Sequence, residues 1–536
     1  MYKSISTNKP LQILLVFGCL IIGLFHFPLS LVELNLSYIP GDLGDARFIN
    51  FVLEHGYQYL IGNEPSFYDA PFFYPAKNTL ALSDNMAGTL PIYAFFRSLN
   101  YSRETAYQLW WVSIFVINYF VAFFCFKNIS KNNYIAILGA YLFTFSMIMF
   151  GQVNFTQLNI RFMLPLIILF AYRFITELNV KFYYLLVISI ALQFVLGVYY
   201  AFLSIYLLLI IYLTYLLFYK NIGAIKILFS NKKQTIKTIG FTLSVIAFLL
   251  VYMQNYIAIS SQVGLHRFSD VINLIPTFTS YFLANDGSIW AFTNNYGKHL
   301  LPDSWWLNQF FMGLFPLIFL IVNFIYNYKN RHSTFNFLLI SIIVAILGSV
   351  LYANKYSALA LFYLLPGFGS LSVLVRVITV IFTLIVFVNI QFLTKVFNKY
   401  KKWNLILFIL LFLFLVFDNW VDTSKLSKTK KETILNRYKN IDAQINKPND
   451  KKIIAIVSET PDSRNFKFHM DAFLYAQTKG LKSINGYSSN APKNFGYFWE
   501  NHNRKTLNDW CIYNNIDTNK IIIIDNKNPI TNTYYE

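Results

Sequence analysis

The sequence predicts an α-helical polytopic membrane protein. Of its 536 residues, 56% are hydrophobic and 19% are aromatic, and the mean hydropathy is +0.46. Only 13% of the residues are charged, whereas soluble domains carry roughly 25%. A soluble multidomain enzyme could not keep this much apolar surface away from water, and a disordered chain would contain less of it. The lipid bilayer is therefore the expected environment.

Eleven apolar runs have about the length of 20 residues that a helix needs to cross a bilayer. They cover residues 11–32, 107–126, 134–150, 161–176, 182–199, 201–219, 238–257, 309–327, 334–352, 373–394 and 403–420. Residues 1–420 are thus predicted to form a transmembrane domain of about eleven helices. Pro366, Gly367 and Gly369 predict a broken or re-entrant segment over residues 356–370.

The net charge of +19 follows the predicted topology and does not indicate a nucleic-acid surface. With the N-terminus in the cytoplasm, one set of loops collects the lysines, and the opposite set includes the long loops 33–106 and 258–308. In loop 33–106, eight acids outnumber four bases. This asymmetry fits the positive-inside rule and predicts a multi-pass protein with a cytoplasmic N-terminus and both long loops outside.

Residues 421–536 differ in composition from the rest of the chain and are predicted to form a small extracytoplasmic α/β domain. Charged residues, proline and asparagine become frequent, and residues 451–458 and 520–525 are typical of short apolar strands. An odd number of spans places this domain on the side of the long loops. No nucleotide-binding fingerprint, serine nucleophile motif or Cys/His zinc pattern occurs, so nothing indicates ATP or nicotinamide chemistry.

Two carboxylates in the first long loop are the leading catalytic candidates. Asp42 and Asp45 are three residues apart, just where helical periodicity begins, so we expect them on one face of a helix start at the membrane surface. Such a pair can bind a divalent cation, Mg or Mn, or one member can accept a proton from a sugar hydroxyl. The alternative is an N-capping aspartate with a solvated neighbour.

A cation near the outer end of the tenth span is the leading candidate for binding phosphate. The guanidinium of Arg376 can bind two phosphate oxygens at once, although an arginine at this depth can also extend to the lipid headgroups. Asp84 stands among apolar residues and needs a partner, or it caps the helix that follows. Further substrate-binding candidates are Arg47, Glu54, His55, Lys77, Asn154 and Gln157; for Asn154 and Gln157 the alternative is to satisfy the backbone of a turn.

Two stretches of the first long loop resemble a known enzyme class. GDLGDARFINFVLEHGYQYL (residues 41–60) and PFFYPAKNTLALSDNMAGTLPIYAFFR (71–97) are similar to a bacterial group within the GT-C class of glycosyltransferases. The resemblance extends to LPGFGSLSVLVRV within residues 364–378 and to INGYSSNAP (484–492), a turn-rich loop expected to be structural. Two places depart from the group: loop 151–159 lacks a histidine, and Asn308 and Gln309 stand where an acid is common.

The resemblance implies a GT-C-like fold and a membrane-embedded hexosyl- or pentosyltransferase. Such an enzyme takes a sugar from a polyprenyl-phosphate donor and transfers it, usually with inversion, to a glycan, lipid or protein acceptor of the cell envelope on the outer face. Its catalytic acid lies in the first outer loop, which corresponds to Asp42 or Asp45. Arg376, together with a divalent cation if one is bound, would stabilise the departing phosphate.

Two other functions are compatible with a chain of many spans. A ligase or polymerase of surface polysaccharide depends on arginines and a histidine in a late loop, and the acid-rich first loop argues against it. A flippase or transporter of lipid-linked sugars needs polar residues at mid-membrane, and charged residues are nearly absent there.

Overall fold

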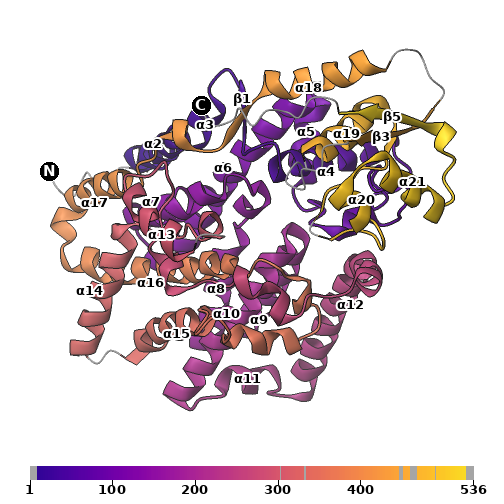
Figure 1. The fold of residues 1–536 in the computed structure, drawn as a ribbon. Coiled ribbons are helices and arrows are strands. Elements are labelled where there is room, and N and C mark those ends of the chain that lie inside the picture. Colours follow the sequence, from indigo (N-terminus) through magenta and orange to yellow (C-terminus); the bar gives the residue numbers. More distant parts are fainter. Residues whose placement is uncertain are drawn as a thin grey trace.

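The protein was analysed as a computed structural model that describes residues 9–301, 304–330, 333–445, 451–458, 467–488 and 490–526. Each predicted span contains a helix of a large bundle (Figure 1). In chain order these are α2 (Lys9–His26) with α3 (Pro28–Val32), α6 (Arg103–Ser130), α7 (Asn133–Thr144), α8 (Met163–Glu177), α9 (Val180–Leu196), α10 (Val198–Tyr219), α12 (Lys232–Val263), α14 (Leu314–Asn330), α15 (Ser333–Ser349), α16 (Val377–Lys399) and α17 (Asn404–Asp418).

These helices are not all full-length spans. Within the described residues, six segments are long and apolar enough to cross a membrane: Lys9–Val32, Arg103–Ser130, Asn133–Gln152, Val198–Tyr219, Lys232–Val263 and Leu374–Lys399. Other helices of the bundle are shorter; α8 and α17 have 15 residues each, about 22 Å of helix against a hydrocarbon core of about 30 Å. Six of the eleven predicted spans are thus confirmed as long enough by this criterion, and the number of eleven crossings stays a prediction. The protein is a multi-pass membrane protein with several short helices.

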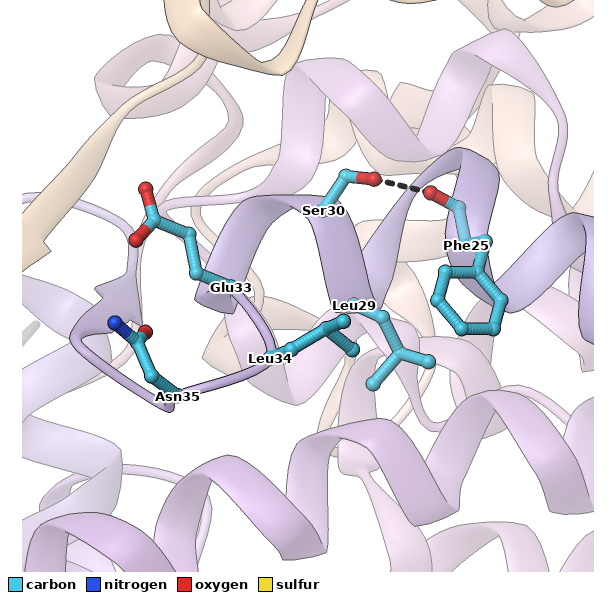
Figure 2. Close-up of a pocket in the computed structure, with 6 residues that line it drawn as sticks. All are labelled: Phe25, Leu29, Ser30, Glu33, Leu34 and Asn35. Atoms are coloured by element: carbon cyan, nitrogen blue, oxygen red, sulfur yellow. Dashed lines mark hydrogen bonds between the residues drawn. The ribbon is translucent and has the colours of Figure 1, made fainter.

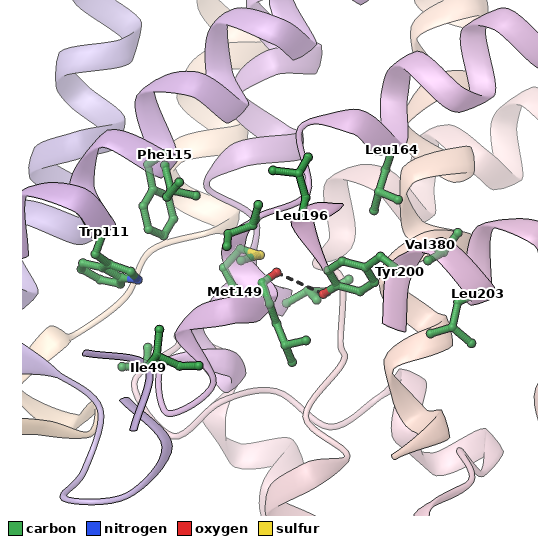
Figure 3. Close-up of a cluster of buried hydrophobic side chains, with 14 of the residues drawn as sticks. Ile49, Trp111, Phe115, Met149, Leu164, Leu196, Tyr200, Leu203 and Val380 are labelled. Carbon is green, nitrogen blue, oxygen red and sulfur yellow. Dashed lines mark hydrogen bonds between the residues drawn. The ribbon is translucent and has the colours of Figure 1, made fainter. Parts of the chain in front are cut away.

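The centre of the bundle is α16. Its residues from Val377 to Leu393 are all buried, and it packs against α7, α8, α10, α14 and α15. A helix that is apolar on every side is stable only when neighbours or lipid surround it. Figure 3 shows the adjoining core, where Tyr200 of α10 donates a hydrogen bond to the carbonyl of Leu158 at 3.1 Å. The residue directly before this rigid helix is Arg376, so its backbone position is well fixed.

The helix α12 has the opposite environment. Of its 32 residues only Thr238 and Ile259 are buried, and it lies at the edge of the bundle (Figure 1). Its exposed isoleucine, leucine and valine side chains match the lipid tails of a bilayer. The short α11 (Gly223–Leu228) connects α10 to this helix at the end of the bundle away from the C-terminal part.

The C-terminal part contains a small parallel sheet with helices around it. Its strands β3 (Ile453–Val457), β4 (Lys482–Ser483) and β5 (Ile521–Asp525) lie in the order β4-β3-β5, with Ile453 opposite both Lys482 and Ile521. Both strands predicted from the sequence are thus confirmed. The helices are α18 (Lys431–Gln444), α19 (Lys467–Lys479), α20 (Gly496–Asn501) and α21 (Arg504–Tyr513).

The first long loop and the C-terminal part are joined by backbone pairing. Strand β1 (Tyr38–Pro40) pairs antiparallel with β2 (Lys428–Lys430), so that Tyr38 lies opposite Lys430. The loop then forms α4 (Asp45–Leu60) and α5 (Leu90–Ser98), and α4 packs against α19. The second long loop contributes α13 (Asn294–Leu300). As Figure 1 shows, the C-terminal helices and sheet gather beside α4 and α5.

A buried ion pair network fixes this contact. Asp471 of α19 accepts hydrogen bonds from Arg47 of α4 at 2.7 Å and from Nε of Arg437 of α18 at 2.9 Å. Burial alone would raise the pKa of Asp471, but the charges of the two arginines outweigh burial and hold this pKa below its ordinary value. Arg47 therefore links the first loop to the C-terminal part.

Replacing Asp471 by asparagine should release the C-terminal part from the first loop. The change leaves two buried guanidinium groups without a counter-charge, which costs about 3–5 kcal/mol. We expect much faster proteolysis of residues after 421 in membranes. Asp442→Asn is the control, because Asp442 pairs with Lys479 at 2.8 Å on the surface, where an ion pair contributes about 0–1 kcal/mol. Equal proteolysis rates of the two variants would contradict the assigned role.

Candidate active site

The two candidate carboxylates lie at the start of α4, but only one belongs to the helix. Gly41 has φ +82°, and a Cβ there would press against Ala46 and the backbone of Val153. The turn continues through Asp42, whose Oδ1 accepts the N–H of Gly44 at 2.8 Å, and α4 begins at Asp45. The prediction that both aspartates share one face of a helix is therefore wrong, because the turn at Gly41 keeps Asp42 outside the helix.

A second loop supports this turn. The backbone N–H of Asp42 donates to Oδ1 of Asn154 at 3.1 Å. Asn154 and Gln157 belong to the segment between α7 and α8, which forms two short 3-10 helices, η2 (Met147–Gln152) and η3 (Thr156–Asn159). Gln157 hydrogen-bonds to the carboxylate of Asp45. Both amides predicted as ligand-binding residues thus lie beside the candidate carboxylates.

Asp45 is a partly buried carboxylate with several partners. Its Oδ1 accepts a hydrogen bond from the hydroxyl of Tyr487, which comes from the C-terminal part. Burial raises the pKa of Asp45, and the negative charge of Asp42 adds to this, whereas the hydrogen bonds and the charge of Arg376 oppose it; the pKa lies above its ordinary value. A carboxylate with a raised pKa is a stronger base than a solvated one.

Arg376 brings a positive charge to the same place. It ends a short 3-10 helix, η10 (Leu374–Arg376), and only 8% of it is exposed. Its guanidinium carbon lies 4.2 Å from the ring centre of Tyr199 and 5.6 Å from that of Phe155. Among the described residues, no side chain forms an ion pair or hydrogen bond with this guanidinium. Its planar donors are thus held by two aromatic rings and remain available to an anion.

Asp84 lies close to Arg376 as well, and it caps a different helix from the one expected. Its Oδ1 accepts the N–H of Val198, the first residue of α10, at 3.2 Å. It therefore caps α10, and the helix that follows it in sequence, α5, begins only at Leu90. Burial raises the pKa of Asp84, while the Val198 N–H and the charge of Arg376 oppose this rise. The charge of Arg376 thus acts on both Asp45 and Asp84.

Tyrosines of α12 hold the loop that carries Asp84. The hydroxyl of Tyr256 donates to the carbonyl of Ser83 at 3.0 Å and accepts the N–H of Asn85 at 3.1 Å. Tyr252 donates to Oδ1 of Asn85 at 3.0 Å. This loop, the α9–α10 turn and α12 meet around Asp84 and leave no space as large as a water molecule between them.

Three other predicted site residues have partners inside the first loop. Glu54 is buried and accepts hydrogen bonds from Tyr93 and Arg97 at 2.6 and 2.8 Å. His55 is buried, with its Nε2 3.1 Å from the carbonyl oxygens of residues 66 and 67. Lys77 is largely exposed and pairs with Asp69 at 3.3 Å. Each of these three side chains therefore contacts another part of the first loop, and Arg47 contacts Asp471 of the C-terminal part.

The carboxylates form a limited donor set for a metal ion. Within the described ranges, no group of three or more His, Cys, Asp or Glu side chains could hold a metal ion together. Asp42 and Asp45 would have to share a cation with the amide oxygens of Asn154 and Gln157, while Asp45 Oδ1 is already bonded to Tyr487. A hard divalent cation prefers about six oxygen ligands, so it would need water or substrate oxygens in addition to these residues.

A surface hollow lies away from these residues. Figure 2 shows a cavity of about 500 Å³ at the α2–α3 junction, where the hydroxyl of Ser30 donates to the carbonyl of Phe25. Its lining residues are Phe25, Leu29, Ser30, Glu33, Leu34 and Asn35. None of the predicted site residues lines it, and its carboxylate, Glu33, pairs with Lys428 at 3.5 Å.

The sequence interpretation missed two tyrosines of the site. Tyr199 was the last residue of the predicted span 182–199, although it belongs to α10 in the structure, and its ring contact with Arg376 reveals it. Tyr487 lies in the INGYSSNAP loop, which was expected to be structural. The resemblance of that loop to the GT-C group was the available signal.

Solved structures share the arrangement of this chain. An archaeal oligosaccharyltransferase, AglB from Archaeoglobus fulgidus in complex with an inhibitory peptide and a dolichol-phosphate, matches with a TM-score of 0.51 at 11% identity, over 95% of this chain and 69% of that chain. The Archaeoglobus fulgidus oligosaccharyltransferase in the apo form gives a TM-score of 0.46 at 11% identity, over 95% and 69%. No family model and no curated protein matches the sequence. At this identity the likeness concerns the fold, and it supports the predicted GT-C-like fold.

Proposed function

We propose that this chain is an integral membrane glycosyltransferase. It transfers a sugar from a polyprenyl-phosphate-linked donor to a glycan, lipid or protein acceptor of the cell envelope, at the outer face of a bacterial cytoplasmic membrane. The observation that carries the proposal is the convergence of Asp45 and Asp84 with Arg376, from three distant segments, where the bundle meets its long loops. The complex of AglB with a dolichol-phosphate supports a lipid phosphate as the donor.

The proposed reaction is a single displacement at the anomeric carbon. The free carboxylate oxygen of Asp45 accepts the proton of the acceptor hydroxyl or amide while the acceptor atom attacks this carbon. The bond between the carbon and the phosphate oxygen breaks, and its electron pair leaves with polyprenyl phosphate. Arg376 stabilises the negative charge that develops on the phosphate. Attack opposite the leaving group inverts the configuration of the sugar.

Asp84 has a separate task in this proposal. Its carboxylate is held by the N–H of Val198 and faces the charge of Arg376, so it can accept hydrogen bonds from sugar hydroxyls and stabilise positive charge on the ring.

The raised pKa of Asp45 determines how the transfer rate depends on pH. A base must be deprotonated, so transfer should fall as the pH drops through this raised pKa, at a higher pH than for an ordinary aspartate.

The test is transfer from a defined donor. Membranes containing the chain are incubated with a panel of polyprenyl-phosphate sugars that are radiolabelled in the sugar, and the label is followed from the organic phase into glycan, lipid and protein fractions. The proposal expects transfer from at least one donor that is absent from membranes lacking the chain. A folded protein that leaves every donor of a broad panel intact would contradict it.

A further inference from the structure

One residue of the C-terminal part reaches into the candidate active site. We propose, on the basis of the proposed function, that Tyr487 is a positioning residue for transfer: its hydroxyl holds Oδ1 of Asp45, so that the other carboxylate oxygen faces the acceptor. The docked C-terminal part is then required for a competent carboxylate. Asp45 and Tyr487 are separated by 442 positions in the sequence, so only tertiary structure can provide this contact.

The loop that carries Tyr487 is rigidly attached to the sheet. The side chain of Asn485 is fully buried and bridges the backbone of Ile456 in β3, accepting its N–H at 2.8 Å and donating to its carbonyl at 2.9 Å. The N–H of Ile484 also donates to Ile454 at 3.0 Å. These bonds fix the backbone just before Tyr487, so the sheet determines where its side chain can lie.

The same loop is in close contact with the first long loop. Gly486 packs against the ring of Phe73 so tightly that a Cβ would overlap with it. The N–H of Phe73 donates to the carbonyl of Asn485 at 3.3 Å, and the hydroxyl of Ser488 donates to the carbonyl of Leu82 at 2.9 Å. Position 486 therefore needs glycine for this close approach.

The ring of Tyr487 is held between two aromatic side chains. Its centre lies 5.8 Å from that of Phe48 in α4 and 6.1 Å from that of Trp499 in α20. These contacts depend on the ring and not on the hydroxyl. Replacing Tyr487 by phenylalanine therefore keeps these ring contacts and removes the donor to Asp45.

The hydroxyl also affects the protonation of Asp45. The groups around this carboxylate are Asp42 on the preceding turn, Arg376 before α16, Gln157 in η3, Tyr107 of α6 and Tyr487. The Tyr487 hydrogen bond is the strongest of the influences that lower the pKa of Asp45. Without this hydrogen bond, the effect of burial is less compensated, so the pKa of Asp45 should rise further. A smaller fraction of Asp45 should then be ionised at a given pH.

The experiment compares Tyr487→Phe with Ser488→Ala and wild type. Transfer is measured from about pH 5 to about pH 9 at saturating donor, together with the acceptor KM. We expect Tyr487→Phe to transfer about tenfold more slowly on the acid side and to show a smaller loss at alkaline pH, where the carboxylate is ionised but no longer held by the hydroxyl. Ser488→Ala removes another hydrogen bond from the same loop and should leave the shape of the pH profile unchanged.

A second measurement does not depend on activity. A water-soluble carbodiimide modifies protonated carboxyl groups, and mass spectrometry can follow its reaction at Asp45 against pH. Tyr487→Phe should move the midpoint of modification to higher pH. An unchanged midpoint together with a transfer rate equal to that of Ser488→Ala at every pH would overturn the role of Tyr487. Absence of transfer by the wild type would contradict the proposed function instead, and the carbodiimide midpoint would still decide the role of the hydroxyl.

Discussion

Asp45→Asn should lower transfer about 10³-fold, within the range of about 10²- to 10⁴-fold that general base catalysis contributes. Asparagine has nearly the same shape and can still accept the Tyr487 hydrogen bond, but its amide cannot accept the acceptor proton. The loss should therefore appear mainly in kcat, with donor binding largely retained. Initial rates of sugar transfer by membranes with equal amounts of each protein would measure it.

Asp42→Asn is the matched control for this prediction. Asp42 is close enough to influence Asp45, yet its carboxylate accepts the N–H of Gly44 and belongs to the turn before α4. An asparagine can maintain that turn, so we expect a loss of less than about tenfold. If Asp42→Asn abolished transfer while Asp45→Asn retained it, the assignment of the base would be reversed.

Arg376→Met should lower transfer about 10²- to 10³-fold, because it removes the cation that faces the departing phosphate. Arg376→Lys keeps the charge but loses the planar donors and the ring contacts with Tyr199 and Phe155, so we expect an intermediate loss of about tenfold. Both variants should also raise the KM for the donor. Rates measured against donor concentration separate the two effects.

The control for the arginine variants is Arg173→Lys. Arg173 pairs with Glu177 at 3.3 Å, one helical turn away near the C-terminal end of α8. Its replacement should leave transfer unchanged. Full activity of Arg376→Met would show that the phosphate is stabilised by other groups and would refute the assigned role.

The sequence was sufficient to predict the helices of the bundle. It also predicted the two longer strands of the C-terminal part. Apolar runs predict helices because a bilayer tolerates little else, and the run at residues 373–394 is now the buried α16. The number of full-length spans was less predictable, because some apolar runs form helices of only 15 residues, as α8 and α17 do.

The site could be predicted only in part. Asp45 and Arg376 can be recognised in the sequence, because an isolated charge near an apolar run is costly unless a partner or a ligand compensates for it. The proximity of Arg376 to Asp45 and Asp84 results from packing between segments that are more than 100 positions apart. Arg47 was predicted to bind substrate for a similar reason. Its partner Asp471 lies 424 positions away in the sequence, and their contact gives Arg47 a structural role. Tyr487 has an ordinary sequence environment, so only the docked C-terminal part reveals it.

The most direct test of the proposed function uses purified protein in proteoliposomes. The donor carries one radiolabel in the sugar and another in the phosphate, so that release of polyprenyl phosphate and formation of glycosylated acceptor are counted together. A transferase predicts equal amounts of both products with wild type and neither with Asp45→Asn. Movement of the intact donor across the bilayer, without cleavage of the sugar–phosphate bond in either protein, would contradict the proposal and indicate a flippase.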